Sequence, residues 1–188
     1  MINFPDLTAD DIEVRVDRVN ANKANTGVGL NLLLYKDARV DMKLLDETVG
    51  QENWQRKHFK LDGTTFCSVG ILCNINTPNG DDMEWVWKTD CGSPSNFESE
   101  KGAASDAFKR AGFNWGIGRE LYTCPELFVW QPNDTPDPFF TVAYKQDGKP
   151  TTYDKFECAK ILTEDKKIVA VAIRNTSTGK MWSIDTRS

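Results

Sequence analysis

Two stretches of alternating apolar and polar residues constrain the fold of this 188-residue chain more than any other feature. The first stretch spans residues 64–75 and the second residues 83–87. Successive side chains of a β-strand point to opposite faces, so the apolar positions of each stretch share one face. They are Cys67, Val69, Ile71, Cys73 and Ile75 in the first stretch, and Met83, Trp85 and Trp87 in the second. Turn-forming residues precede the first stretch (Asp62-Gly63) and separate the two (residues 77–81). With a strand over residues 54–61, the pattern predicts a three-stranded antiparallel meander.

A helix is predicted after this meander, over residues 96–115. Ser95 and Glu98 form the S-x-x-E pattern of a capping box, and Gly116 and Gly118 mark the other end. The apolar residues between them recur every three or four positions: Ala104, Phe108, Ala111 and Trp115. The small residues Gly102, Ala103, Ala104 and Ala107 would let the helix lie close to the sheet. We therefore expect an α+β fold, in which an antiparallel β-meander followed by a long helix forms a βββα core.

The flanking segments predict smaller elements. Ile12, Val16 and Val19 recur at helical spacing, which indicates a helix from Thr8 that ends before Asn20. A strand is expected over residues 29–35, a second helix over 39–48, and two or three strands within residues 156–162, 167–174 and 180–184. These elements suggest a main domain at residues 1–125, a proline- and aromatic-rich wrapping segment at 126–150, and a small C-terminal β unit at 151–188.

The composition narrows the class of protein. The five cysteines include no C-x-x-C pair, and His58 is the single histidine, so we expect reduced thiols and neither a zinc site nor a disulfide framework. The sequence contains neither a phosphate-binding loop nor a G-x-S-x-G motif. No apolar run approaches the roughly 18 residues of a membrane-spanning helix, and the N-terminus lacks the pattern of a signal peptide. We expect a cytoplasmic protein that is not an enzyme, binds no cofactor and has no membrane partner.

Positively charged residues occur on two of the predicted elements. Lys101 and Lys109 lie on one stripe of the predicted helix, and Arg110 and Arg119 stand near its C-terminal end. Cations at that end also complement the helix dipole, which is the structural alternative to ligand binding. On the first strand of the meander, Arg56 and Lys57 form either a basic patch or a protected sheet edge. The formal net charge of −5 argues against nucleic-acid binding unless such cations gather on one surface.

Two segments carry a resemblance to a known family. The segment LLYKDARVDMKLLDETVGQENW, residues 33–54, resembles the opening of the Rad-fifty-two-type single-strand annealing proteins. The segment EKGAASDAFKRAGFNWGIGRELY, residues 100–122, is similar to the helix of that family with its S/T-D-x-x-K-R-A core, in the form of the phage Sak-like members. With the meander between them, the resemblance covers residues 8–122.

The resemblance implies an ATP-independent protein of DNA recombination and repair. It implies subunits that join side by side into a ring, and a single-stranded DNA partner that lies in a basic groove with its bases free for pairing. Carried over position by position, it makes Lys109 and Arg110 phosphate contacts and matches Tyr35 and Arg39 to an aromatic and a basic position, whereas Arg119 belongs to the phage-like form. Residues 112–114 depart from the eukaryotic pattern, which has a further basic residue there. A single-strand-binding protein and a phage exonuclease are further candidate partners.

Two other classes of function stay open at this level. Paired acids at Asp10-Asp11, Asp46-Glu47 and Asp81-Asp82 would suit a magnesium-dependent, DNA-processing nuclease, although acids are common at helix starts and turns. A ring-forming accessory protein that binds only protein is the third alternative.

Overall fold

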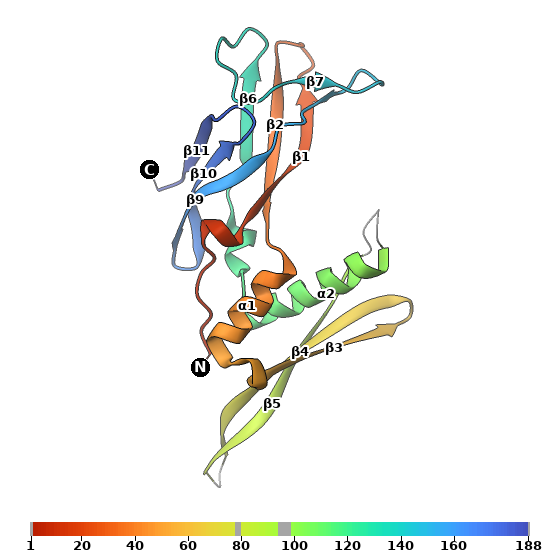
Figure 1. Cartoon of the computed structure of the whole chain (residues 1–188), viewed down its shortest axis with the longest axis vertical. Coiled ribbons are helices and arrows are strands. Elements are labelled where there is room, and N and C mark those ends of the chain that lie inside the picture. Colours follow the sequence, from red (N-terminus) through yellow and green to blue (C-terminus); the bar gives the residue numbers. More distant parts are fainter. Residues whose placement is uncertain (1, 78–79, 94–98, 188) are drawn as a thin grey trace. The chain divides into compact units, whose positions relative to one another are not determined.

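The computed structural model describes residues 2–77, 80–93 and 99–187 (Figure 1). The chain divides into two compact units that alternate along the sequence. Unit 1 comprises Met1–Pro5 and Asp37–Arg119, and unit 2 comprises Asp6–Lys36 and Glu120–Ser188. Each unit therefore contains segments that are distant in sequence.

Unit 1 contains a three-stranded antiparallel sheet and two helices (Figure 1). The strands are β3 (Trp54–Leu61), β4 (Thr64–Thr77) and β5 (Gly80–Cys91), with β4 in the centre. The helices are α1 (Ala38–Val49) and α2 (Ser99–Trp115), and a 3-10 turn, η2 (Gln51–Asn53), leads from α1 into β3. Asp62 and Gly63, which join β3 to β4, have φ values of 49° and 78°. Positive φ at both central residues is typical of a type I′ turn, which explains why the Asp-Gly pair predicted this hairpin.

One face of the unit 1 sheet packs against α2. Cys67, Val69 and Ile71 of β4 are fully buried there, and α2 buries its small and aromatic residues against them: Ala103, Ala107, Phe108 and Ala111. Gly92, which follows β5, lies so close to the helix that an added Cβ would be 1.9 Å from the Ala103 carbonyl oxygen. The small residues of α2 thus do allow a close approach. The predicted cap at Ser95–Glu98 lies outside the described residues.

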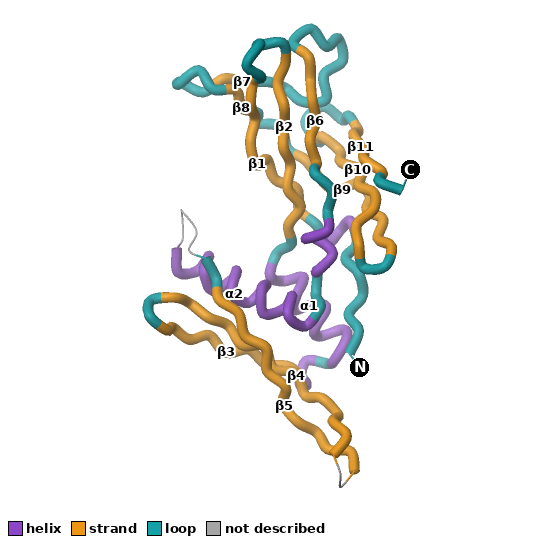
Figure 2. The backbone as a smooth tube through the Cα atoms, turned by 180° about the vertical axis from the view of Figure 1, so that it is seen from behind, coloured by secondary structure: helices purple, strands orange, loops and turns teal. Residues whose placement is uncertain are grey.

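Unit 2 is built on a six-stranded sheet with the order β11-β10-β9-β1-β2-β6. Figure 2 shows its strands in orange, with β1, β2 and β6 side by side. Every described pairing in this sheet is antiparallel. The strands are β1 (Glu13–Ala21), β2 (Gly27–Tyr35), β6 (Leu127–Pro132), β9 (Phe156–Glu164), β10 (Lys167–Asn175) and β11 (Met181–Asp185). A separate two-stranded sheet joins β7 (Ala143–Tyr144) to β8 (Pro150–Thr151), and two 3-10 turns, η1 (Ala9–Asp11) and η3 (Arg119–Thr123), flank the unit's strands.

The predicted fold class is wrong. An α+β chain with a βββα core, a long helix and a small C-terminal β unit was expected, but the chain is mostly β, with three sheets and two short helices of 12 and 17 residues. The largest sheet lies outside the predicted core. The expected C-terminal unit is not separate either, because β9 pairs with β1 at Glu157 and Glu13, so that β9, β10 and β11 extend the sheet of β1, β2 and β6.

The helix predicted from Thr8 is also wrong, since this segment forms η1 and then β1. A β-bulge between Val16 and Arg18 explains the error. The bulge adds one residue to the strand, so Val16 and Val19 point to the same face although they are three positions apart. That spacing imitates the period of a helix.

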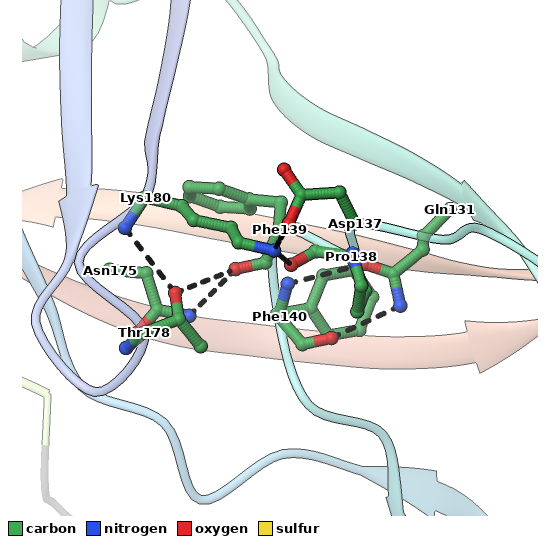
Figure 3. A network of polar contacts seen from close by, with 8 residues as sticks. All are labelled: Gln131, Asp137, Pro138, Phe139, Phe140, Asn175, Thr178 and Lys180. Atoms are coloured by element: carbon green, nitrogen blue, oxygen red, sulfur yellow. Dashed lines mark hydrogen bonds and ion pairs between the residues drawn. The ribbon is translucent and has the colours of Figure 1, made fainter.

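The predicted wrapping segment, residues 126–150, contains a strand of the large sheet, β6, and then an irregular stretch that polar contacts hold in place (Figure 3). Gln131 Nε2 donates to the Phe140 carbonyl at 3.0 Å, and the Phe140 N–H donates to Gln131 Oε1 at 3.2 Å. Asn175 donates to the Phe139 carbonyl at 2.8 Å, and Lys180 donates to the Pro138 carbonyl at 2.8 Å. Residues 137–140 are therefore tied both to β6 and to the turn between β10 and β11.

Candidate nucleic-acid interface

The cations predicted on α2 lie in different environments. Lys101, in the first turn, is exposed, whereas Lys109 and Arg110 are half-buried near the end of the helix. Arg110 Nε is 3.3 Å from Asp90 Oδ1 on β5, which ties this part of the helix to the sheet. Within the part of the chain that the structure describes, the side chain of Lys109 makes no ion pair or hydrogen bond. Its ammonium group therefore keeps its capacity for an anionic ligand.

Arg119 lies against the C-terminal end of α2. Its Nε donates to the Phe113 carbonyl at 2.5 Å and its second guanidinium nitrogen donates to the Asn114 carbonyl at 2.8 Å. The last carbonyls of a helix have no partner within the helix and carry partial negative charge. Arg119 therefore serves as a helix cap, which is the dipole role that the sequence left as an alternative to ligand binding.

Lys88, which the sequence analysis did not select, joins the same end of the helix. It lies on β5, on the face that packs against α2, and its Nζ donates to the Asn114 carbonyl at 2.8 Å. Its ammonium group is also 4.4 Å from the centre of the Trp115 ring. The alternation of β5 places Lys88 opposite Val69, a buried position, and this could have indicated its orientation.

Lys88, Lys109, Arg110 and Arg119 are named here the α2-end cluster. Asp90 is the acid that forms a described ion pair with this cluster. It pairs with Arg110 and also accepts a hydrogen bond from Asn114 at 3.3 Å. Lys88 and Arg119 both donate to the Asn114 carbonyl and Arg110 pairs with Asp90, so cations gather at this end of the helix. Such a gathering of cations suits a phosphate group.

The structure separates Arg56 from Lys57, because neighbouring residues of a strand face opposite ways. Arg56 lies under α2, with its guanidinium carbon 4.7 Å from the centre of the Phe108 ring. Lys57 lies on the other face of the sheet, with its ammonium nitrogen 4.3 Å from the centre of the Trp87 ring. The two residues do not form one basic patch.

The first family-like segment places its two candidate residues in different units. Arg39, in the first turn of α1 in unit 1, is strongly exposed and lies 4.0 Å from the Asp37 carboxylate, a loose surface pair. Tyr35, the last residue of β2 in unit 2, donates its hydroxyl to Glu13, and the guanidinium of Arg15 lies 5.6 Å from the centre of its ring. Arg39 is therefore exposed at the surface of unit 1, whereas Tyr35 is half-buried and engaged with Glu13 and Arg15 in unit 2.

The comparison with protein families decides the identity of the chain. The model of the Rad52/22 family of double-strand break repair proteins matches residues 6–140, which is most of the chain. This chain belongs to the Rad52/22 family. Its function therefore lies in DNA repair and recombination. The comparisons found no match among curated proteins or solved structures.

The Rad52/22 match spans segments of both units. It contains β1 to β6, both helices and every candidate residue named above, and it ends at Phe140 before β7. Strands β7 to β11 therefore lie beyond the matched residues. They contribute half of the six-stranded sheet, because β9, β10 and β11 pair with one another and with β1.

Two of the acids that suggested a nuclease have structural roles. Asp11 accepts hydrogen bonds from the backbone and hydroxyl of Thr8 at 3.0 and 2.7 Å, and Asp46 accepts one from Trp54 Nε1 at 2.7 Å. Among the residues that the structure describes, no group of three or more histidine, cysteine or acidic side chains is arranged to hold a metal ion.

The cysteines are free thiols, and burial is the dominant influence on three of them. It raises the pKa of Cys67, Cys124 and Cys158 to about 11, which keeps these thiols protonated and unreactive at neutral pH. Over the described residues, no helix has the length and apolar character needed to cross a membrane.

Proposed function

We propose that this Rad52/22 family member binds single-stranded DNA and anneals complementary strands without ATP, as a phage-encoded recombination protein of the Sak-like form. The observation that carries the proposal is the α2-end cluster, in which four cations lie near the C-terminal end of α2 inside the family-matched residues. Lys109 is the principal phosphate contact, because it is the member without a described structural partner. Arg110 assists it, while Lys88 and Arg119 raise the local potential.

Annealing requires no bond chemistry, which agrees with a site made of cations rather than of paired acids and bases. Stacking in the duplex supplies about 1.4 kcal/mol per base-pair step, so the protein needs only to hold two strands extended and to reduce their mutual repulsion. Contacts to phosphate provide most of such sequence-independent affinity. We assign self-association and the phosphate contacts of the α2-end cluster to residues 1–125.

The open face of the unit 1 sheet supports self-association. The face turned away from α2 carries exposed apolar side chains: Phe59, Leu61, Met83 and Trp85. Lys57 is the one charged residue among the described side chains of this face. Contiguous exposed apolar patches mark interaction sites in soluble proteins, and the cores of subunit interfaces are poor in charge. We propose that subunits join through this face into a ring, which would multiply weak phosphate contacts along one strand.

An annealing assay tests the proposal. Two complementary labelled oligonucleotides are mixed with the full chain in EDTA and without nucleotide, and fluorescence energy transfer reports pairing. We expect annealing well above the protein-free rate, together with rings in electron micrographs. Annealing at the protein-free rate would overturn the proposal. DNA shortening that needs Mg²⁺ would favour a nuclease, and the absence of DNA binding at low salt would favour an accessory protein.

The site is tested separately by Lys109→Ala. Loss of one phosphate contact should reduce the dependence of log affinity on log salt by about 0.7 for single-stranded DNA, and should weaken binding at low salt about threefold to tenfold. The matched control is Lys167→Ala, which removes the same charge from an exposed residue of β10 beyond the family match. Equal salt dependence in the wild type, K109A and K167A would remove Lys109 from the site.

A further inference from the structure

Unit 2 displays two large aromatic side chains on the outer face of β6. Phe128 and Trp130 are 44% and 42% exposed, although they alternate with the buried residues Leu127, Val129 and Gln131. β6 therefore uses one face for the core and presents rings on the other. Exposed aromatic side chains on a sheet surface are the platform on which several nucleic-acid-binding domains stack bases.

Glycines in the neighbouring strand seat these two rings. A Cβ added to Gly29 would lie 2.5 Å from a ring carbon of Phe128, and one added to Gly27 would lie 2.5 Å from a ring carbon of Trp130. The rings thus lie over bare backbone of β2. This contact stabilises strand glycines by covering them, and it also fixes the orientation of both rings while much of their surface stays open to solvent.

A hydrogen-bonding group and a cation continue the same row across the sheet. Phe128 pairs with Asn31 on β2, and Asn31 pairs with Arg18 on β1, so the three side chains stand in one line on one face. Neighbouring strands are about 4.8 Å apart, which puts the guanidinium of Arg18 within reach of the backbone of a nucleotide whose base lies on Phe128. Arg18 is exposed and makes a long ion pair of 3.6 Å with Asp17.

Further cations lie beyond Arg18, at a pocket of about 390 Å³ between β1 and the β7–β8 hairpin. Arg18, Lys145 and Lys149 line this pocket together with Asp17. Lys149 is 3.0 Å from the Asp147 carboxylate on an exposed turn, a contact that solvent weakens. Two acids of the outer face are hydrogen-bonded: Glu126 accepts from Asn31 at 3.0 Å, and Glu13 accepts from Tyr35.

We propose that this row is a base-stacking site for single-stranded nucleic acid: two bases stack on Phe128 and Trp130, and the adjoining phosphates are bound by Arg18 and the cations of the pocket. The inference rests on the proposed function and deepens it, because it assigns base contacts to unit 2 and leaves the α2-end cluster as a phosphate site. A nucleic acid fits this row better than an apolar protein surface does. The two rings, the amide of Asn31 and the guanidinium of Arg18 follow one another across three neighbouring strands, and they match bases and phosphates.

The test compares two ligands of equal length, oligo(dT) and an abasic deoxyribose-phosphate oligomer that keeps the phosphates. The variant is the double substitution Phe128→Leu and Trp130→Leu, which still covers the glycines with apolar atoms but removes both stacking surfaces. We expect the wild type to bind oligo(dT) about tenfold or more tightly than the abasic oligomer, and the variant to lose most of this preference. The salt dependence of binding should stay unchanged, because no phosphate contact is removed.

The controls separate this inference from the proposed function. Tyr153→Leu removes an exposed ring elsewhere in unit 2 and should leave the preference for bases intact. K109A should lower the salt dependence and keep the preference. A double variant that is folded by circular dichroism and keeps the wild-type preference for oligo(dT) would overturn the inference. A double variant that changes only the oligomeric state would also overturn it, because a second copy of the chain would then cover the outer face of β6. A wild type that binds neither ligand would overturn the proposed function itself.

Discussion

Replacing Gly92 by alanine should destabilise unit 1 strongly, because the added methyl group has no room. The Cβ would lie 1.9 Å from the Ala103 carbonyl oxygen and 2.7 Å from the Ala107 nitrogen. Both atoms belong to the backbone of α2, so no side chain can rotate away. Ordinary van der Waals contact begins at 3.4 Å, so the helix and the sheet would have to separate by about 1.5 Å.

That separation opens the layer in which α2 covers the buried residues of β4. Overpacking a core costs about 1–3 kcal/mol, and a shift of backbone against backbone belongs at the upper end of that range, so we expect a loss of about 3 kcal/mol. With a typical urea dependence of about 2 kcal/mol per molar, the unfolding midpoint should fall by about 1.5 M. Because the chain has two units, hydrogen exchange read by mass spectrometry should locate the loss in α2 and β5.

The exposed neighbour Ser93 provides the control, since Ser93→Ala should change stability by less than about 0.5 kcal/mol. The same Gly92→Ala protein should also bind single-stranded DNA more weakly, because α2 carries the α2-end cluster. A G92A protein with a wild-type midpoint and wild-type exchange in α2 would refute the close packing on which this reasoning depends.

Three further predictions concern single groups. Gln131→Ala leaves the buried N–H and carbonyl of Phe140 without their partner, and should lower the free energy of unfolding in urea by about 2–5 kcal/mol. The control Gln146→Ala changes an exposed residue and should be nearly neutral. Equal unfolding midpoints for the two variants would contradict this. Burial raises the pKa of Cys67 from 9.0 to about 11, so the unfolded chain loses the thiol proton at lower pH than the folded chain does. The free energy of unfolding should therefore fall as pH rises from 9 to 11. Cys67→Ala should reduce that fall, and an unchanged fall would exclude Cys67 as a cause. Arg119→Ala removes two hydrogen bonds from the end of α2 and should lower the free energy of unfolding by about 1–2 kcal/mol, with Arg119→Lys intermediate. Hydrogen exchange should become faster in the last turn of the helix. Unchanged exchange there would count against the capping role.

Much of unit 1 could be predicted because its signals are local. The Asp62-Gly63 pair dictates a type I′ hairpin, and the alternation over residues 64–75 gives the strand and its buried face. The spacing of apolar residues was misleading where one inserted residue changed it. The bulge after Val16 made a strand resemble a helix, and only the pairing with β2 distinguishes the two.

The candidate site was predictable in part for the same reason. The K-R pair on α2 could be selected from its motif, but its electrostatic environment could not. Lys88 and Asp90 reach the helix from β5, and whether they meet Asn114 and Arg110 depends on how the sheet packs against the helix. The sequence likewise left two roles open for Arg119, and only the packed structure shows that it caps the helix.

By itself, the sequence determined the helices of unit 1, its hairpins and the family, because backbone preference and motif identity are fixed by residues close together in the chain. The tertiary structure decided which strands share a sheet and which side chains meet. Gly29 and Phe128 come together from opposite ends of the family match, and β9 joins β1 across most of the chain. Such pairings depend on the apolar surface that the whole unit buries, and no short segment contains that information.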